Sequence, residues 1–91
     1  MKGKLNIHDF YCTQCGKKTL PVPRKLGQLR EAGHLKKLFC CYCGKENNCV
    51  EVNPMSSKYT YEDFLFEFDN GNFNEDGTRK MKYGIFKSHL A

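Results

Sequence analysis

The chain has 91 residues, a net charge of +5 and a hydrophobic fraction of 40%, and it contains no tryptophan. A chain of this length forms one domain, and none of its apolar runs approaches the roughly 20 residues that a membrane-spanning helix needs. The sequence therefore excludes a helical membrane protein. A domain this small is expected to gain much of its stability from a bound metal.

The positive charge lies in the first half of the chain. Residues 1–50 contain 10 Lys and Arg against 3 Asp and Glu, whereas residues 51–91 contain 5 against 7. The first half therefore suits an anionic partner such as nucleic acid, although a solvated lysine-rich surface would give the same composition.

In chain order, the first predicted element is a short strand over the first ten residues, where Leu5, Ile7 and Phe10 supply the apolar positions. Residues 20–23, Leu-Pro-Val-Pro, are expected to be extended, because each proline biases the residue before it away from helix.

A short cysteine-containing motif occurs twice in the chain. Residues 11–17 read Tyr-Cys-Thr-Gln-Cys-Gly-Lys, and residues 39–45 read Phe-Cys-Cys-Tyr-Cys-Gly-Lys. Two cysteines separated by two residues can turn both sulfurs toward one point, and two such pairs supply the four thiolates of a tetrahedral zinc site. We therefore expect one structural zinc ion, with the ligands Cys12, Cys15, Cys40 and Cys43.

The residues around these cysteines have predicted roles as well. Gly16 and Gly44 follow the second cysteine of each pair, where the turn needs a positive φ. The lysines that come next would offset the negative charge of a zinc–tetrathiolate centre. The aromatic residues in front of the two pairs, Tyr11 and Phe39, are expected to pack beside the metal as a small core.

Other uses of the cysteines stay open. Disulfides or a redox dithiol would employ the same pairs, but the N-terminus lacks the apolar run of a signal peptide and a reducing cytosol disfavours disulfides. We expect a cytoplasmic protein in which Cys41 points away from the metal and Cys49 is a small buried hydrophobe. The alternatives are a register that uses Cys41 with Cys43 or Cys49, and a second metal bound by Cys41, Cys49 and a histidine.

The segment between the two pairs predicts a helix over residues 24–32, followed by a turn and a strand into the second pair. Leucines and an alanine recur at a spacing of three over residues 26–38, which is typical of a helix. Gly33 would end this helix as a C-cap.

A strand is predicted over residues 47–52, followed by a linker over 53–57. The sequence Thr60-Tyr61-Glu62-Asp63 then resembles a capping box, and the apolar residues Tyr61, Phe64, Leu65 and Phe68 recur at helical spacing. Asn70-Gly71 is a natural stop. Residues 72–79 are expected to be a loop, and residues 80–87 a final strand or a disordered basic tail.

These elements define an α+β fold: a small zinc ribbon with two Cys-x-x-Cys knuckles on short β-hairpins, an inserted basic helix and a C-terminal amphipathic helix. We expect a single domain in which residues 1–53 form the ribbon and residues 54–91 form an aromatic, acidic part that packs on it.

The chain also resembles small zinc-ribbon proteins found on phages and prophages of Gram-positive bacteria. The resemblance is carried by the cysteine pairs, by residues 33–40 and 48–51, and by the segment from Phe64 to Phe73. In such proteins a histidine often occupies the position of Cys49, which leaves open a role for this residue as a metal ligand or beside the metal. The resemblance implies a phage protein in the bacterial host cytoplasm, and it implies no established enzyme activity.

The first functional hypothesis is a zinc-stabilised, nucleic-acid-binding protein that regulates transcription. Its basic side chains would contact phosphates and give a salt-dependent affinity with little sequence preference. The candidate contact residues are Lys17, Lys18, Arg24, Lys25, Arg30, Lys36 and Lys37.

The alternative hypothesis is a protein-binding module that docks on, or inhibits, a host complex such as a polymerase or a defence machinery. The acidic and aromatic C-terminal half would make this contact through Phe66, Glu67 and Asp69, with Phe66 expected to be exposed because it lies off the apolar face of its helix. An enzyme is not expected, since a zinc ion with four cysteine ligands has no open position for water.

Overall fold

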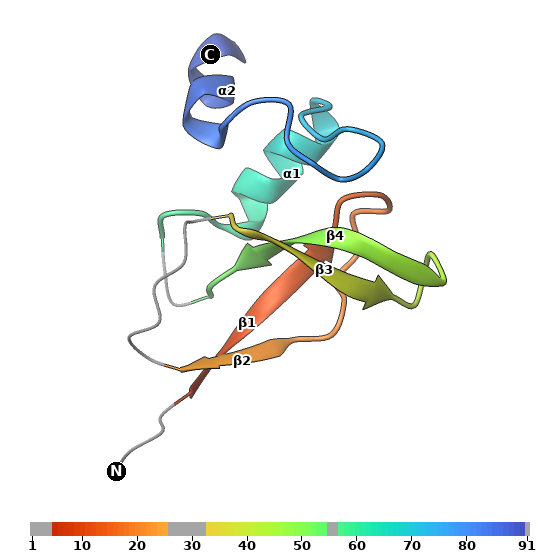
Figure 1. Ribbon diagram of the computed structural model, residues 1–91. Coiled ribbons are helices and arrows are strands. Elements are labelled where there is room, and N and C mark those ends of the chain that lie inside the picture. The colour runs from red at the N-terminus through yellow and green to blue at the C-terminus, as the bar shows by residue number, and fades with distance from the viewer. Residues whose placement is uncertain (1–4, 26–32, 55–56, 91) are drawn as a thin grey trace.

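The computed structural model describes residues 5–25, 33–54 and 57–90. A four-stranded antiparallel sheet with the strand order β2-β1-β4-β3 is followed by two helices (Figure 1). The elements are β1 (Leu5–Cys12), β2 (Val22–Lys25), β3 (Leu35–Cys40), β4 (Lys45–Val52), α1 (Tyr61–Asp69) and α2 (Tyr83–Leu90). The predicted α+β class is confirmed. No helix among the described residues is long and apolar enough to cross a membrane.

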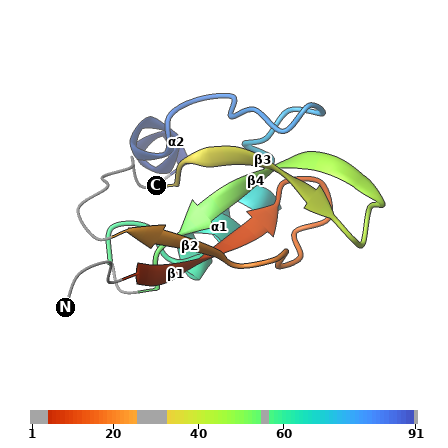
Figure 2. The same cartoon turned by 60° about the horizontal axis from the view of Figure 1, so that its bottom comes forward.

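The two faces of the sheet carry two different cores. Side chains alternate between the faces of a strand, so the neighbours Cys49 and Val50 on β4 belong to different clusters. One cluster holds Phe10, Cys12, Cys40 and Cys49, all fully buried. The other packs Val50, Val52, Tyr59 and Phe64 together, on the face against which α1 lies (Figure 2). Cysteines thus predominate in one core and aromatic residues in the other.

The strands predicted over the first ten residues, before the second cysteine pair and after it, are confirmed as β1, β3 and β4. The predicted helix over residues 24–32 is wrong at its start, because residues 24–25 belong to β2, which pairs with β1. The prolines explain this difference: Pro21 and Pro23 favour extended backbone, and an edge strand tolerates a residue without an N–H. The rest of that prediction, residues 26–32, lies outside the described residues.

Helix α1 begins where the capping box predicts. Thr60 accepts a hydrogen bond from the Asp63 backbone N–H, and the Asp63 carboxylate accepts one from the Thr60 N–H at 2.8 Å. The helix ends before Asn70, as predicted, and Phe64 is its fully buried aromatic. Local capping and the apolar face therefore position α1 together.

We expect Thr60→Ala to lower the free energy of unfolding by about 1 kcal/mol, because the N–H groups of the first turn lose their side-chain acceptor. For a domain of this size this corresponds to a melting temperature lower by about 4–8 °C, measurable by thermal denaturation. The exposed Ser57, outside the helix, gives a matched control as Ser57→Ala. Equal melting temperatures for the two variants would contradict a stabilising cap.

The last segment differs from its prediction. Residues 80–87 were expected to form a strand or a disordered tail, whereas Tyr83–Leu90 form α2. Tertiary contacts override the weak alternation here: Phe86 is 6% exposed and meets the Phe66 ring edge-on at 5.7 Å, and the Tyr83 hydroxyl donates to Asp63 at 2.5 Å. These contacts attach α2 to α1.

Candidate metal centre

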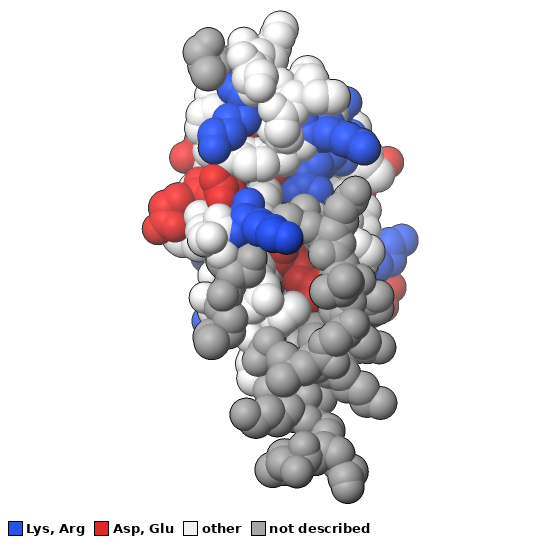
Figure 3. All heavy atoms as spheres, turned by 90° about the vertical axis from the view of Figure 1, so that its left-hand side faces the viewer, with Lys and Arg blue, Asp and Glu red and all other residues white. Residues whose placement is uncertain are grey.

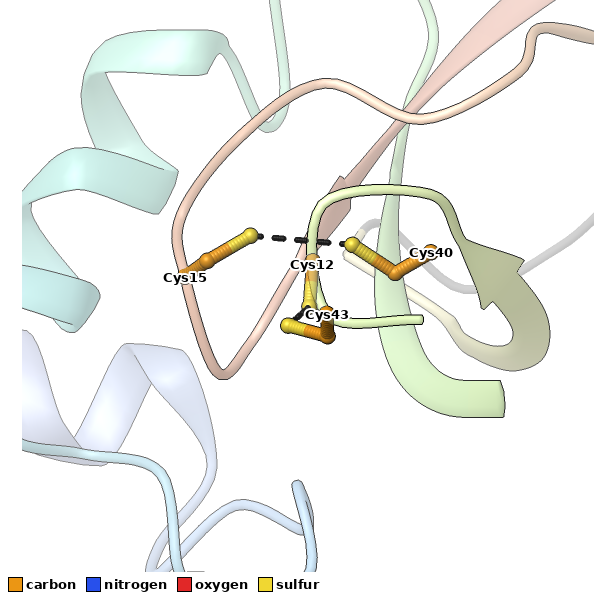
Figure 4. A group of neighbouring side chains, drawn as sticks. All are labelled: Cys12, Cys15, Cys40 and Cys43. Atoms are coloured by element: carbon orange, nitrogen blue, oxygen red, sulfur yellow. Dashed lines mark hydrogen bonds between the residues drawn. The ribbon is translucent and has the colours of Figure 1, made fainter. Parts of the chain in front are cut away.

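The sheet brings the two cysteine pairs together. Cys12 ends β1 and Cys40 ends β3, and both strands are hydrogen-bonded to β4 between them. The second cysteine of each pair follows in the turn after the strand. As a result the four sulfur atoms of Cys12, Cys15, Cys40 and Cys43 all lie within 4.8 Å of one another (Figure 4).

The spacing of the sulfur atoms fits one tetrahedral ion. The Sγ atoms of Cys12 and Cys43 lie 3.9 Å apart, and those of Cys15 and Cys40 lie 3.7 Å apart. Four sulfurs at about 2.3 Å from a central zinc ion would be separated by about 3.8 Å. The observed distances are too long for disulfides, whose sulfurs are about 2.05 Å apart. The four cysteines therefore form a candidate metal site.

Both cysteine pairs fold into the same turn. Gly16 and Gly44 have φ values of +75° and +74°, as predicted from their positions. Their N–H groups donate to the carbonyls of Cys12 and Cys40, each at 2.8 Å. A side chain at Gly16 would also meet Phe68 of α1 at 3.0 Å, so helix α1 lies directly against the first turn.

Hydrogen bonds to sulfur favour the thiolate form of Cys40, whereas burial raises the pKa of the Cys15 thiol and raises that of Cys43 to about 12. Burial opposes ionisation of Cys40 as well, but hydrogen bonds from the backbone of Cys43 and Tyr42 and from the neighbouring cysteine side chains together outweigh it and lower the pKa of its thiol to about 7. Cys12 accepts from the Gln14 N–H and from the Asn47 side-chain amide, each at 3.4 Å. Such donors stabilise thiolate ligands.

Sequence reasoning missed Asn47. This residue is only 8% exposed and lies on β4 two positions before Cys49, hence on the same face of the sheet as the metal-side core. The alternation of Asn47 with Cys49 was the signal that could have identified it.

The two remaining cysteines do not join the cluster. Among the described residues, the candidate metal ligands comprise neither Cys41 nor Cys49. Cys49 is fully buried, as predicted, and burial raises the pKa of its thiol to about 12, so it stays neutral. Cys41 is exposed, in agreement with a side chain that points away from the metal.

The predicted aromatic core beside the metal is wrong. Phe39 is 55% exposed, and Tyr11 packs on the other face of the sheet, where its ring stacks on Phe64 at 5.3 Å. The reason is the period of two along a strand: a residue directly before an inward-facing cysteine must face the opposite side. Phe10, two positions before Cys12, is the aromatic residue that fills the metal-side core.

The predicted phosphate-contacting residues do not form one helical face. Lys17 and Lys18, which follow the first cysteine pair, are exposed. On β3, Lys37 is exposed and Lys36 is half-buried. Lys18 pairs with Asp9 at 3.5 Å, and the Lys17 ammonium lies 4.7 Å from the centre of the Tyr42 ring. Two further candidates lie on β2 and one lies outside the described residues: Arg24, Lys25 and Arg30.

The predicted protein-binding surface is corrected in two places. Glu67 is fully buried, so its predicted surface position is wrong, and Phe66 is half-buried by Phe86 rather than exposed. Asp69 is exposed. In the upper part of Figure 3, which corresponds to the helical half, Lys and Arg side chains lie beside Asp and Glu side chains, so this face has mixed charge.

Glu67 belongs to a buried polar network that the sequence did not indicate. Its carboxylate accepts hydrogen bonds from the Tyr59 hydroxyl, from Asn72 at 2.6 Å, and from Arg79 at 2.7 and 2.9 Å. Arg79 also donates to the Gly33 carbonyl at 2.5 Å. The network therefore ties the segment before α2 to α1 and to the start of β3.

Comparisons with family models, curated proteins and solved structures found no match to this chain. The cysteine cluster and the surface around it therefore carry the functional argument.

Proposed function

We propose that this protein is a zinc-stabilised domain that binds nucleic acid with the surface around its two cysteine turns. Zinc is the ion that suits the donor set, because it prefers four-coordinate tetrahedral sites and binds thiolates strongly. Four protein ligands leave no open position, so the ion would hold the two turns together and take no part in catalysis.

The observation that carries the nucleic-acid proposal is the charge of the two segments around the metal site. Residues 10–20 and 33–45 contain five lysines and no aspartate or glutamate. A zinc ion with four thiolates contributes a charge of about −2, so these segments keep a clear positive excess. Lysines that neutralise phosphates release the cations condensed on the nucleic acid, which gives an affinity that falls with salt.

The competing proposal, a protein-binding surface on α1, loses its support from the structure. Its central acidic residue, Glu67, is buried against Arg79, and its aromatic residue, Phe66, packs on Phe86. On the lysine surface, Lys17, Lys37 and Lys45 are exposed, as is Lys18, which pairs with Asp9. We therefore place nucleic-acid binding first.

The test is fluorescence anisotropy of the zinc-loaded protein with labelled single-stranded and double-stranded oligonucleotides over a salt series. We expect micromolar or tighter binding at low salt. Changing Lys17, Lys37 and Lys45 together to glutamine should weaken binding and flatten the plot of log K against log salt. The expected change in slope is about 0.7–0.9 for each phosphate contact removed.

The matched control changes three exposed lysines of the helical half, Lys80, Lys82 and Lys87, to glutamine. This variant has the same net charge as the test variant, so a difference between the two locates the binding surface. If both triple variants lost the same affinity, net charge alone would explain the effect and the binding surface would not be located. Absence of binding at low salt would contradict the proposal.

A further inference from the structure

Two aromatic side chains in and next to the second cysteine turn are exposed. Phe39 is 55% exposed and Tyr42 is 60% exposed. They are three residues apart, so their Cα atoms lie no more than about 11 Å from each other. Tyr42 belongs to the second cysteine turn, and Phe39 precedes Cys40 on β3 and faces the opposite side of the sheet, so both rings are exposed within three residues of a candidate metal ligand.

Lysines accompany both rings. Lys37 and Phe39 lie two positions apart on β3 and are both exposed, so they share one face of the strand. The Lys17 ammonium lies over the Tyr42 ring, 4.7 Å from its centre, and Lys45 opens β4 opposite Cys40. The acidic residue closest in register is Glu46, opposite Phe39. Each ring is thus accompanied by at least one lysine that can contact a phosphate.

We infer that Phe39 and Tyr42 are stacking platforms for the bases of a single-stranded nucleic acid, whose phosphates contact Lys17, Lys37 and Lys45. Every base has a face that can stack on an aromatic side chain, and this contact needs bases that are not paired in a duplex. Alternating aromatic and cationic groups is the chemistry that distinguishes a single strand from a duplex, which offers only phosphates to such a surface.

This inference rests on the proposed function and makes it more specific. It predicts a preference for single strands over duplexes, and only slight preference among base sequences, because stacking does not read hydrogen-bonding edges. It also assigns a role to residues that phosphate binding alone would not use.

The test compares the zinc-loaded protein with its Tyr42→Ala and Phe39→Ala variants, using labelled oligothymidine of about 12 nucleotides and a duplex of the same length. We expect each alanine variant to bind the single strand about 5- to 100-fold more weakly, and the duplex with unchanged affinity. The salt dependence of single-strand binding should stay the same, because the phosphate contacts remain.

Two controls separate stacking from structure. Tyr42→Phe keeps the ring and should bind like the original protein. Tyr61→Ala removes a partly exposed aromatic residue of α1 that also packs on Tyr11, and it should leave single-strand binding of the folded protein unchanged. Zinc content and circular dichroism establish that each variant is folded.

The failures of the two proposals differ. The protein could bind single strand and duplex equally, with neither Tyr42→Ala nor Phe39→Ala changing the affinity. This result would overturn the stacking inference but would leave the nucleic-acid proposal standing. Equal weakening of both ligands would also overturn it, because the ring would then act on the fold. No binding of either oligonucleotide at low salt would overturn both proposals and favour a protein partner.

Discussion

Cys40→Ser is expected to abolish metal binding and to unfold the sheet. Apparent binding free energies of structural zinc sites are about 10–16 kcal/mol, comparable to the roughly 5–15 kcal/mol of net stability of a small domain. If loss of one thiolate prevents zinc binding, the domain loses stabilisation of the same order as its whole net stability. Zinc stoichiometry, measured with a colorimetric chelator on the purified protein, and far-ultraviolet circular dichroism would record both effects.

Loss of the metal should disrupt the structure beyond the metal site, because two of the candidate ligands are also part of the buried core on that face of the sheet. Cys12 and Cys40 are fully buried and pack with Phe10 and Cys49. The first cysteine turn is also the surface against which Phe68 of α1 lies. A strong chelator added to the original protein should consequently produce the same circular dichroism spectrum as Cys40→Ser.

The matched control is the neighbouring Cys41→Ser. Cys41 is exposed and stands outside the cluster of sulfurs, so this variant should keep its zinc and its spectrum. Retention of zinc by Cys40→Ser together with its loss from Cys41→Ser would overturn the ligand assignment. Cys49→Ser tests a third role: its sulfur is buried but not a candidate ligand, so zinc should stay bound while stability decreases.

The elements that sequence reasoning predicted correctly have local causes. The spacing of the cysteine pairs and the following glycines dictates the two turns, and the capping box at Thr60 dictates the start of α1. Each of these signals depends on residues within four positions of one another. The candidate metal ligands could thus be named from the sequence, although their approach depends on strand pairing through β4.

The errors concern residues whose environment is set by distant parts of the chain. Glu67 looks like a surface residue of an amphipathic helix, but its partner Arg79 lies in a loop 12 residues later. Residues 80–87 have a weak local preference, and contacts with Phe66 and Asp63 decide that they form a helix. Phe39 was misplaced for a different reason: the period of two was not applied across the end of the strand.

Arg79→Met is expected to lower the free energy of unfolding by about 3–5 kcal/mol, a larger loss than that of any substitution on the exposed surface. Glu67 is fully buried, and Arg79 is its cationic partner. Methionine retains much of the side-chain volume but leaves a carboxylate in the core without a counter-charge. The Gly33 carbonyl loses its donor as well. Urea denaturation would measure the change, with Lys80→Met, an exposed neighbour, as the control.

A second substitution identifies the buried charge as the cause. Glu67→Gln in the Arg79→Met background removes the carboxylate charge. Tyr59 and Asn72 donate to different oxygens of Glu67, so the glutamine oxygen can accept from Asn72 while its NH2 group donates to the Tyr59 hydroxyl oxygen. If the unpaired charge dominates, this double variant should be more stable than Arg79→Met alone, although Glu67→Gln by itself destabilises the protein. That reversal of sign is a coupling that a double-mutant cycle reports directly. Strictly additive effects would mean that the packing of Arg79 on the Tyr59 and Phe73 rings, rather than its charge, holds the C-terminal segment in place.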